Sequence, residues 1–442
     1  MAKLELDPQK IYKMPDPVFI KKIDSYYLVI ASETANWLLL QNEKQLEIFQ
    51  LLSGGKSVKE VMNGLDGADG KELYHVLVEL EAKKFENLRV NYPQEHGMYM
   101  YLTNRCNQRC RHCYMYAGEQ KEKELTTEEV LEILKEFSAA GGKVVTFTGG
   151  EATTRPDFKI IVTEAKKNGL VVGVLSNGIN WPQEWFEWVG DVIDEVQISV
   201  DGFDAESYRT VRGTDTFATA LDTVERLVKL GLRVTVAVTP LLETLISNEE
   251  KYIRFAKQLL EKYDGNSFFV KFNTELMDGR TINPTNDENV RYRKSIKMIK
   301  DVCAPYSESK GFALDHINNT IFNNCGYGGL TIASNGDIYC CNLVDKCAKQ
   351  GNVRNMSFDD IMNISKKARE LSDINHLLPC KNCALKYLCG GGCRVKHFKS
   401  LVNAVMNENA NEQMFIRENA CTEDYKDSIY RMMIKSNALL YR

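Results

Sequence analysis

Short apolar runs alternate with amphipathic stretches along the middle of the chain, from Met98 to about Leu276. The apolar runs have the length of β-strands and cover residues 98–103, 143–147, 171–175, 195–200, 233–239 and 267–272. The amphipathic stretches begin near Thr126, Pro156, Pro182, Thr216 and Asn248. Strands and helices that alternate at this spacing form parallel sheets with right-handed crossovers. The pattern predicts six β/α units, with a site in the loops at the carboxyl ends of the strands.

Two of the predicted helices carry capping signals at their first turn. The segments Thr126-Thr127-Glu128-Glu129 and Ser247-Asn248-Glu249-Glu250 each place a short polar side chain before acidic residues. Such a side chain can accept a hydrogen bond from a free backbone N–H of the first turn. We expect both segments to begin helices in this way.

The first 92 residues have the pattern of a small α+β domain. Strand-like runs cover residues 18–23, 26–31 and 37–40, and three helical stretches follow them. Asn42 and Ser57 are placed to cap the first two stretches, and Gly54-Gly55 to end the first. The third stretch, residues 71–85, has apolar residues at helical spacing.

The remainder of the chain is rich in loops and cysteines. Segments of this kind depend on metal binding as well as on an apolar core, because ligation supplies folding free energy. We therefore expect three domains, at residues 1–92, 93–300 and 301–442.

Composition limits the possible partners and the location of the protein. The 442 residues carry a formal net charge of −4, so no overall basic field attracts nucleic acid or an anionic membrane. No apolar run approaches the roughly 20 residues that span a bilayer. The chain begins Met-Ala-Lys-Leu-Glu-Leu-Asp, without a signal segment, and we expect a cytoplasmic protein whose thiols stay reduced.

The cysteines form two spaced sets. The first, Cys106-x3-Cys110-x2-Cys113, directly follows the apolar run at 98–103. The second contains seven cysteines and ends at Cys421. Thiolates in groups of three or four are the ligands of iron–sulfur clusters. Three thiolates on a four-iron cluster leave one iron open to a substrate or cofactor.

The first set resembles the signature of the radical S-adenosylmethionine (SAM) enzymes, and the second resembles the SPASM auxiliary-cluster domain. The resemblance covers roughly residues 98 to 425. It implies an α/β fold: an open partial (β/α)6 barrel, preceded by a winged-helix-like α+β domain and followed by a cysteine-rich iron–sulfur domain. It also implies that the open iron of the first cluster binds S-adenosylmethionine, which is cleaved to a 5′-deoxyadenosyl radical.

The same resemblance implies cofactor contacts in the barrel loops. His112 takes the position that touches adenine, although an ordinary loop histidine is the alternative. Gly149, Gly150 and Glu151 match the Gly-Gly-Glu motif whose backbone approaches the methionine amino group, with Ala152 where the family commonly has proline. The further positions implied to contact the cofactor are Ser176, Asn177, Ser199, Asp201 and Arg212. The planar guanidinium of Arg212 suits a carboxylate, which it can bind bidentately.

The SPASM resemblance implies two auxiliary clusters. Their ligands would be Cys325, Cys341 and Cys393 for the first, and Cys380, Cys383, Cys389 and Cys421 for the second. The fourth ligand of the first cluster is Cys347, which we favour, or Cys340, or a substrate thiolate on an open iron. Three [4Fe-4S] clusters would result. A structural zinc site at Cys380 to Cys421 is the alternative.

The N-terminal pattern resembles the leader-peptide recognition domain of peptide-modifying enzymes. A winged-helix DNA reader is the alternative, but acidic residues offset the lysines of its third helix, which a DNA reader needs to be basic. We therefore expect a precursor peptide, bound by its leader, and no nucleic acid or membrane as the partner.

Together these features predict a radical SAM peptide maturase, similar to the sactipeptide and ranthipeptide enzymes, that forms a thioether cross-link. Carbon–carbon cross-linking or another oxidation of the peptide is the alternative within the same chemistry. A non-catalytic peptide-binding redox sensor is the alternative from another class. Asn342 stands where sulfatase-maturing relatives carry an aspartate base, which disfavours that activity. An external donor such as flavodoxin or ferredoxin would supply electrons.

Overall fold

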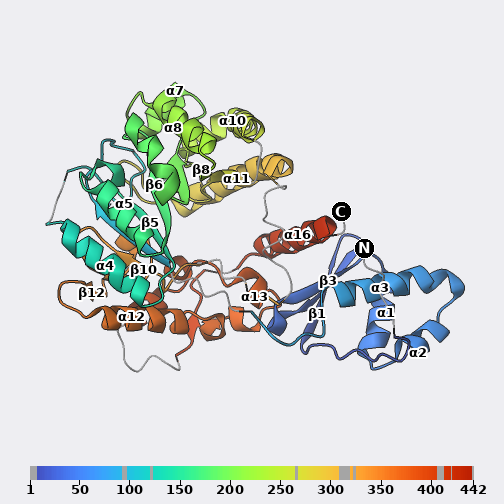
Figure 1. Cartoon of the computed structure of the whole chain (residues 1–442). Coiled ribbons are helices and arrows are strands. Elements are labelled where there is room, and N and C mark those ends of the chain that lie inside the picture. The colour runs from blue at the N-terminus through green and yellow to red at the C-terminus, as the bar shows by residue number, and fades with distance from the viewer. Residues whose placement is uncertain are drawn as a thin grey trace. The chain divides into compact units, whose positions relative to one another are not determined.

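The computed structural model describes residues 7–91, 97–119, 123–263, 267–307, 319–321, 325–405, 413–419 and 421–440. The chain forms two compact units (Figure 1). The first unit combines residues 1–94, 312–327 and 370–442. The second contains residues 95–311 and 328–369. The N-terminal segment and the C-terminal cysteine-rich segment therefore fold together.

The second unit is built on a nine-stranded sheet with the strand order β12-β11-β10-β4-β5-β6-β7-β8-β9. Its strands are β4 (Gly97–Thr103), β5 (Val144–Gly149), β6 (Val171–Ser176), β7 (Glu195–Ser199), β8 (Arg233–Val238), β9 (Phe268–Phe272), β10 (Leu330–Ile332), β11 (Asp337–Tyr339) and β12 (Gly351–Asn352). The strands from β10 to β9 are parallel, and β11 and β12 are antiparallel additions. The six predicted strands are confirmed as β4 to β9.

Helices connect the parallel strands. They are α4 (Thr127–Ala139), α5 (Phe158–Lys167), α6 (Val189–Val192), α7 (Ala205–Arg212), α8 (Phe217–Lys229), α9 (Leu242–Ser247), α10 (Glu249–Lys262) and α11 (Asn286–Ser307). A further helix, α12 (Phe358–Leu371), follows the last strand of the sheet, β12. After Pro182 the chain forms a short 3-10 helix and then α6, in place of one continuous helix. In the described part of the chain, no helix combines the length and the apolarity that crossing a membrane requires.

One of the two predicted caps is confirmed. Thr126 accepts from the backbone N–H of Glu129, and the Glu129 carboxylate accepts from the N–H of Thr126, which closes a capping box on α4. The prediction at Asn248 was wrong, because its side-chain amide donates to the Thr244 carbonyl at 2.9 Å and makes no cap on α10. Asn248 follows α9 directly, so its side chain serves the end of that helix.

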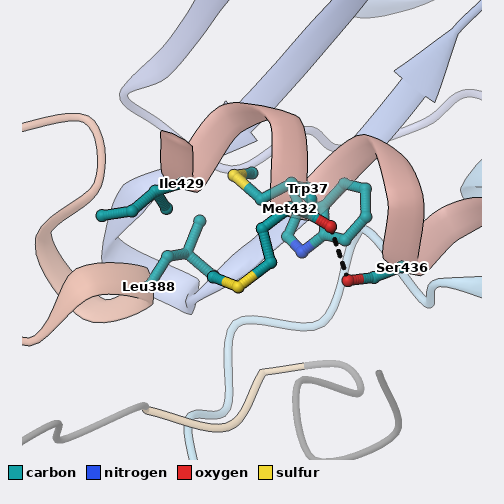
Figure 2. A pocket seen from close by; sticks show the side chains of 6 residues that line it. Trp37, Leu388, Ile429, Met432 and Ser436 are labelled. Carbon is teal, nitrogen blue, oxygen red and sulfur yellow. Dashed lines mark hydrogen bonds between the residues drawn. The ribbon is translucent and has the colours of Figure 1, made fainter. Parts of the chain in front are cut away.

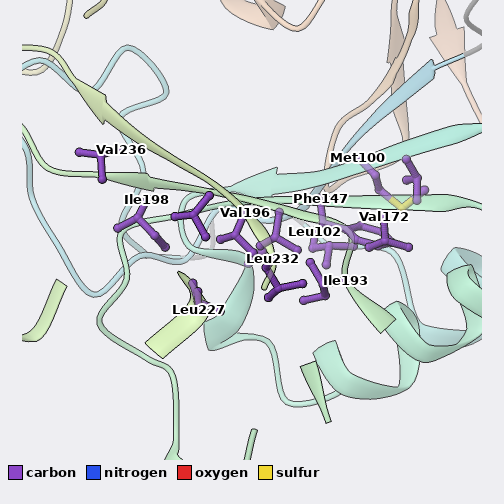
Figure 3. Packing of buried hydrophobic residues seen from close by; sticks show 14 of the residues in the cluster. Met100, Leu102, Phe147, Val172, Ile193, Val196, Ile198, Leu227, Leu232 and Val236 are labelled. Atoms are coloured by element: carbon purple, nitrogen blue, oxygen red, sulfur yellow. The ribbon is translucent and has the colours of Figure 1, made fainter. Parts of the chain in front are cut away.

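Alternate residues of the strands build the apolar core of the second unit. Met100, Phe147, Val172, Val196 and Val236 are fully or almost fully buried, and they pack against the connecting helices (Figure 3). Residues of the opposite parity are half-buried and largely polar; examples are Tyr99, Thr146, Gln197 and Thr235. One face of the sheet is therefore an apolar core, and the other offers polar side chains.

In the first unit, a three-stranded antiparallel sheet carries the N-terminal domain. Its elements are β1 (Val18–Ile23), β2 (Tyr26–Ala31), β3 (Asn36–Leu40), α1 (Glu43–Ser53), α2 (Val58–Asn63) and α3 (Gly70–Ala82). The predicted strands and caps are confirmed. Asn42 accepts from the N–H of Gln45 at 2.9 Å, and Ser57 forms a capping box with Glu60.

The C-terminal part of the first unit consists of short elements and one long helix. They are β13 (Leu377–Leu378), α13 (Lys386–Cys389), α14 (Arg394–His397), α15 (Lys399–Ala404), β14 (Phe415–Ile416) and α16 (Glu423–Leu440). Both faces of the N-terminal sheet are covered. Leu38 packs toward α1 and α3, whereas its neighbour Leu39 packs with Leu388 of α13 and Met433 of α16.

A small apolar pocket lies within this second core. Trp37 of β3, Leu388 of α13 and Ile429 and Met432 of α16 line it (Figure 2). At its edge the Ser436 hydroxyl donates to the Met432 carbonyl at 2.7 Å. The pocket belongs to the junction between the N-terminal sheet and the C-terminal helices.

We predict that Phe147→Ala destabilises the protein by about 3–5 kcal/mol, because it leaves a cavity in the core of the second unit. Phe147 is fully buried in β5. Ile160→Ala is the matched control, since Ile160 is 58% exposed on α5, and its effect should stay within about 0.5 kcal/mol. Denaturant unfolding followed by circular dichroism measures both. Equal effects would contradict the assignment of the core.

Candidate functional site

The three cysteines of the first set lie together in the irregular loop after β4. Cys110 is buried, and Cys106 and Cys113 are half-buried. Burial, together with the Glu151 carboxylate and the thiols of Cys110 and Cys113, raises the pKa of Cys106 to about 11. The backbone N–H of Gln108 opposes this shift by donating to Cys106 Sγ at 3.4 Å. Three crowded thiols of this kind become thiolates when a cationic metal group offsets their charge.

The side chains between the cysteines fasten this loop to the carboxyl ends of the parallel strands. The Asn107 carbonyl oxygen accepts from the Asn177 amide, after β6, at 2.6 Å. The Gln108 carbonyl oxygen accepts from Arg212 at 3.0 Å. His112 Nε2 lies 2.8 Å from the Asp201 carboxylate, after β7. Asn107, Gln108 and His112, which make these three contacts, each lie between two of the cysteines in the sequence.

Asp201 is the centre of this network. Its carboxylate is buried and accepts from Arg212 Nε at 2.7 Å and from the backbone N–H of Thr239 at 2.7 Å. Burial alone would raise the pKa of Asp201, but the charges of Arg212 and His112 hold it at about 2. Asp201 also raises the pKa of the Arg212 guanidinium. The pair is therefore fully ionised at neutral pH.

Glu151 joins the ends of β5 and β6 in the same way. Its buried carboxylate accepts from the Asn177 N–H at 2.6 Å, the Ser176 hydroxyl at 2.9 Å and the Thr153 hydroxyl at 2.7 Å. Burial raises the pKa of Glu151, and these hydrogen bonds oppose the shift. The carboxylate thus fixes the geometry of both strand ends.

The two glycines before Glu151 allow the end of β5 to lie against the cysteine loop. A Cβ on Gly149 would come within 2.3 Å of the Thr103 carbonyl oxygen, and one on Gly150 within 2.3 Å of the Arg105 oxygen. The Gly150 N–H donates to that Thr103 oxygen at 2.8 Å. Only glycine permits this backbone approach.

These contacts give the predicted cofactor residues a further role. The side chains of Glu151, Ser176, Asn177, Asp201, Arg212 and His112 bind one another or the cysteine loop. Ser199, half-buried at the end of β7, makes no hydrogen bond through its hydroxyl among the described residues. Direct contacts of the whole set with S-adenosylmethionine stay a prediction.

Sequence reasoning missed Gln108 and Arg280 as parts of the site. Gln108 lies between Cys106 and Cys110, and its place inside the cysteine motif is the signal that could have identified it. Its side-chain nitrogen donates to the Tyr208 hydroxyl at 3.1 Å. Arg280 donates to the Cys110 carbonyl at 3.3 Å, although it lies 170 residues further along the chain. Nothing in its local pattern indicates that contact.

Cys341 lies near Tyr101 of β4, which contacts Tyr114, the residue after Cys113. The Tyr101 hydroxyl donates to the Asn342 carbonyl at 2.6 Å and lies 3.1 Å from the Tyr114 hydroxyl. Burial raises the pKa of Tyr101 well above its usual value, and the Cys341 thiol adds to the shift. A chain of hydrogen bonds therefore connects the residue after Cys113 with the residue after Cys341.

Two other members of the predicted first auxiliary set, Cys325 and Cys393, meet in the first unit. A hydrogen bond with Cys393 lowers the pKa of Cys325 to about 6, and the Arg394 charge contributes. The Arg394 N–H donates to Cys325 Sγ at 3.4 Å. The lowered pKa favours the thiolate form of Cys325 at neutral pH. Cys341 and Cys347 belong to the second unit.

The four cysteines of the predicted second auxiliary set interact with one another. Burial raises the pKa of Cys380, and Cys389 and Cys383 add to the shift. The pKa of Cys421 is raised by burial and by the same two neighbours. Cys380 and Cys383 lie in and directly after a short 3-10 helix, Cys389 is the last residue of α13, and Cys421 lies two residues before α16.

The donor sets fit iron–sulfur clusters. No three His, Cys, Asp or Glu side chains among the described residues form a group that could hold a single metal ion. The thiolates of an iron–sulfur cluster each bind a different iron, and so need not converge on one point. Cys106, Cys110 and Cys113 would hold one cluster, and the Cys380–Cys421 set another.

Comparison with known proteins agrees with this chemistry. The Radical SAM superfamily model matches residues 100–256, and the SPASM iron–sulfur cluster-binding domain matches residues 324–384. The chain is 35% identical to the sporulation killing factor maturation protein SkfB of Bacillus subtilis over 140 residues, which span 31% of this chain and about a third (34%) of SkfB. It is 27% identical to the mycofactocin maturase MftC of Mycobacterium tuberculosis over 321 residues, which span 67% of this chain and 78% of MftC.

Two solved structures share the fold. The anSMEcpe structure with bound AdoMet matches with a TM-score of 0.52 and 15% identity, over 77% of this chain and 96% of that one. Streptococcus suis SuiB bound to S-adenosylmethionine matches with a TM-score of 0.50 and 15% identity, over 92% of this chain and 99% of SuiB. At this identity the likeness is one of fold.

We predict that Asp201→Asn destabilises the protein by about 3–5 kcal/mol, because it leaves the Arg212 guanidinium buried without a charged partner. It should also speed the loss of iron from the cysteine loop, which His112 and Gln108 would then hold less firmly. Asp215→Asn is the control, since the Arg209–Asp215 pair is exposed. Thermal unfolding and iron analysis measure both. A stable Asp201→Asn enzyme with full iron would show that the network is dispensable.

Proposed function

Because this chain is a radical SAM enzyme with a SPASM iron–sulfur domain, we propose that it matures a ribosomally made precursor peptide by forming a cross-link within it. The observation that carries the proposal is the anchored three-cysteine loop at the carboxyl ends of parallel strands, in one chain with two further cysteine sets. Names of relatives such as SkfB and MftC, both maturation proteins, support a peptide substrate. A thioether from a cysteine sulfur to a carbon is the product we favour.

The residues of the cysteine loop have distinct tasks in this proposal. Cys106, Cys110 and Cys113 would hold a four-iron cluster, and S-adenosylmethionine bound there would supply the radical chemistry that removes hydrogen from carbon. Asp201 and Arg212 keep the loop at a fixed place over the strand ends. His112 is oriented by Asp201, with its ring available to the adenine. Ser199 offers a hydroxyl toward the ribose or carboxylate.

The C-terminal cysteines would hold two auxiliary clusters, for three [4Fe-4S] clusters and about twelve irons per chain. Closing a thioether breaks a C–H bond by loss of a hydrogen atom and the S–H bond of the substrate cysteine by loss of a proton, and one electron is released as the C–S bond forms. An auxiliary cluster is the acceptor for that electron. An external donor such as flavodoxin or ferredoxin supplies the electron that starts each turnover.

The N-terminal sheet is suited to hold the leader of the precursor. β1 lies at an edge of the sheet, and its middle residues are exposed. Among them, Phe19 is 37% and Ile20 44% exposed. An extended peptide can add to such an edge through main-chain hydrogen bonds, while side-chain contacts give selectivity.

The test of the proposed function is mass spectrometry of the precursor peptide encoded beside the gene, after co-expression with the enzyme. We predict a mass lower by two hydrogen atoms for each cross-link formed. Fragmentation then locates the joined residues and separates sulfur–carbon from carbon–carbon bonds. Enzyme with Cys106, Cys110 and Cys113 changed to Ala is the control and should leave the peptide unmodified. An unchanged peptide with the iron-replete wild-type enzyme would refute the proposal.

A second prediction concerns the fourth ligand of the first auxiliary cluster, for which we favour Cys347. Cys347 is half-buried and follows Cys341 after a short loop that can fold back toward the cluster, whereas Cys340 is buried and directly precedes Cys341. We therefore expect Cys347→Ala to lower the iron content and Cys340→Ala to leave it unchanged. Iron analysis and electron paramagnetic resonance measure both. If both variants keep their iron, the open iron is available to a substrate thiolate.

A further inference from the structure

We propose that Lys386 is a positioning residue that fastens the second set of C-terminal cysteines to the N-terminal sheet, so that metal binding there and the conformation of that sheet are coupled. This inference rests on the proposed function for the metal group and the role of the sheet. Its evidence is a buried ion pair and a shared apolar core, both within the first unit.

The ion pair joins the cysteine segment to the turn between β2 and β3. Lys386 stands between Cys383 and Cys389, and its side chain is only 4% exposed. Its ammonium group donates to both carboxylate oxygens of Glu33, at 3.0 and 2.8 Å. Glu33 is 46% exposed, so water reaches it but not its partner. A buried ammonium with one carboxylate depends on that carboxylate for its position.

The apolar core surrounds the same segment. Leu385 and Leu388, which also lie between Cys383 and Cys389, pack with Trp37 and Leu39 of β3. The thiols of Cys383 and Cys389 lie at the edge of this core, half-buried against it. A turn of four residues, α13, therefore carries one of the four cysteines and rests on the sheet.

Charged contacts add a second connection from α16, which follows Cys421. The Asn437 amide donates to Glu79 of α3 at 3.0 Å, and the other Glu79 oxygen accepts from the Leu39 N–H at 3.1 Å. α13, which ends at Cys389, and α16, which begins after Cys421, thus both pack on β3. A shift of β3 moves the cysteines, and by reciprocity metal binding at the cysteines restrains β3.

The adjacent residues Leu38 and Leu39 offer a matched test. Both are buried in β3, but Leu39 faces the cysteine segment and Leu38 faces α1 and α3. In the full-length, iron-loaded enzyme without peptide, we expect Leu39→Ala to speed iron release to a chelator about tenfold, and Leu38→Ala to have less than about a twofold effect. The assay temperature is one at which both variants keep the wild-type circular dichroism.

Glu33→Gln is the second test and changes no apolar contact. It leaves the Lys386 ammonium buried without a carboxylate, and we expect it also to speed iron release. Lys386→Met removes the same ion pair and should also speed iron release, but less than Glu33→Gln, because it leaves no buried charge without a partner. Asp24→Asn is the control: the Asp24–Arg431 pair also joins the N-terminal sheet to the C-terminal part of the first unit, from the turn between β1 and β2 to α16, but its side chains are 64% and 51% exposed.

Hydrogen exchange of the β3 amides in the same iron-loaded samples measures the effect of each variant on the N-terminal sheet. We expect faster exchange in Glu33→Gln and wild-type exchange in Asp24→Asn. Equal iron release from the Leu38→Ala and Leu39→Ala enzymes, or from the Glu33→Gln and Asp24→Asn enzymes, would overturn the proposal. These assays contain no peptide, so their outcome does not depend on whether the enzyme modifies a peptide.

Discussion

The buried pair of Asp201 and Arg212 is the constraint on which the candidate site depends. Neither charge is tolerated without the other in the interior, so Asp201 and Arg212 have to meet, as they do at 2.7 Å. The cysteine loop has no regular secondary structure and takes its position from this pair, through His112 and Gln108. The buried carboxylate of Glu151 holds the ends of β5 and β6 together through hydrogen bonds from Ser176 and Asn177. These buried polar contacts hold the loop with the three thiols at the carboxyl ends of the parallel strands.

Much of this could be predicted from the sequence. Strands β4 to β9 carry buried apolar runs, and the cysteine motif has a spacing with few other meanings. The partners of Glu151, Asp201 and Arg212 could not be predicted, because local spacing does not show which buried charges meet. Strands β10 to β12 have only two or three residues and carry no periodicity. Asn248 failed as a cap because α9 ends beside it and takes its side chain.

The arrangement of the first unit could not be predicted for a different reason. β3 and α16 are separated by most of the chain. The continuous apolar run Trp37–Leu40 of β3 indicates burial on both faces, but it does not show which segment covers the second face. Only the folded chain shows that Leu39 and Met433 share one core. The N-terminal domain is consequently part of the structure that holds Cys383 and Cys389. The proposed peptide-recognition role belongs to the β1 edge of this small sheet, and the proposed metal-supporting role to the face that carries Leu39.

The central claim is that Cys106, Cys110 and Cys113 hold a cluster with one iron open to S-adenosylmethionine. The most direct measurement is the electron paramagnetic resonance spectrum of the reduced enzyme with and without S-adenosylmethionine, in wild type and in the variant with these three cysteines changed to Ala. The account predicts that the cofactor changes the wild-type spectrum and leaves the variant's spectrum unchanged. A wild-type spectrum that does not respond, or a response that survives in the variant, would contradict it.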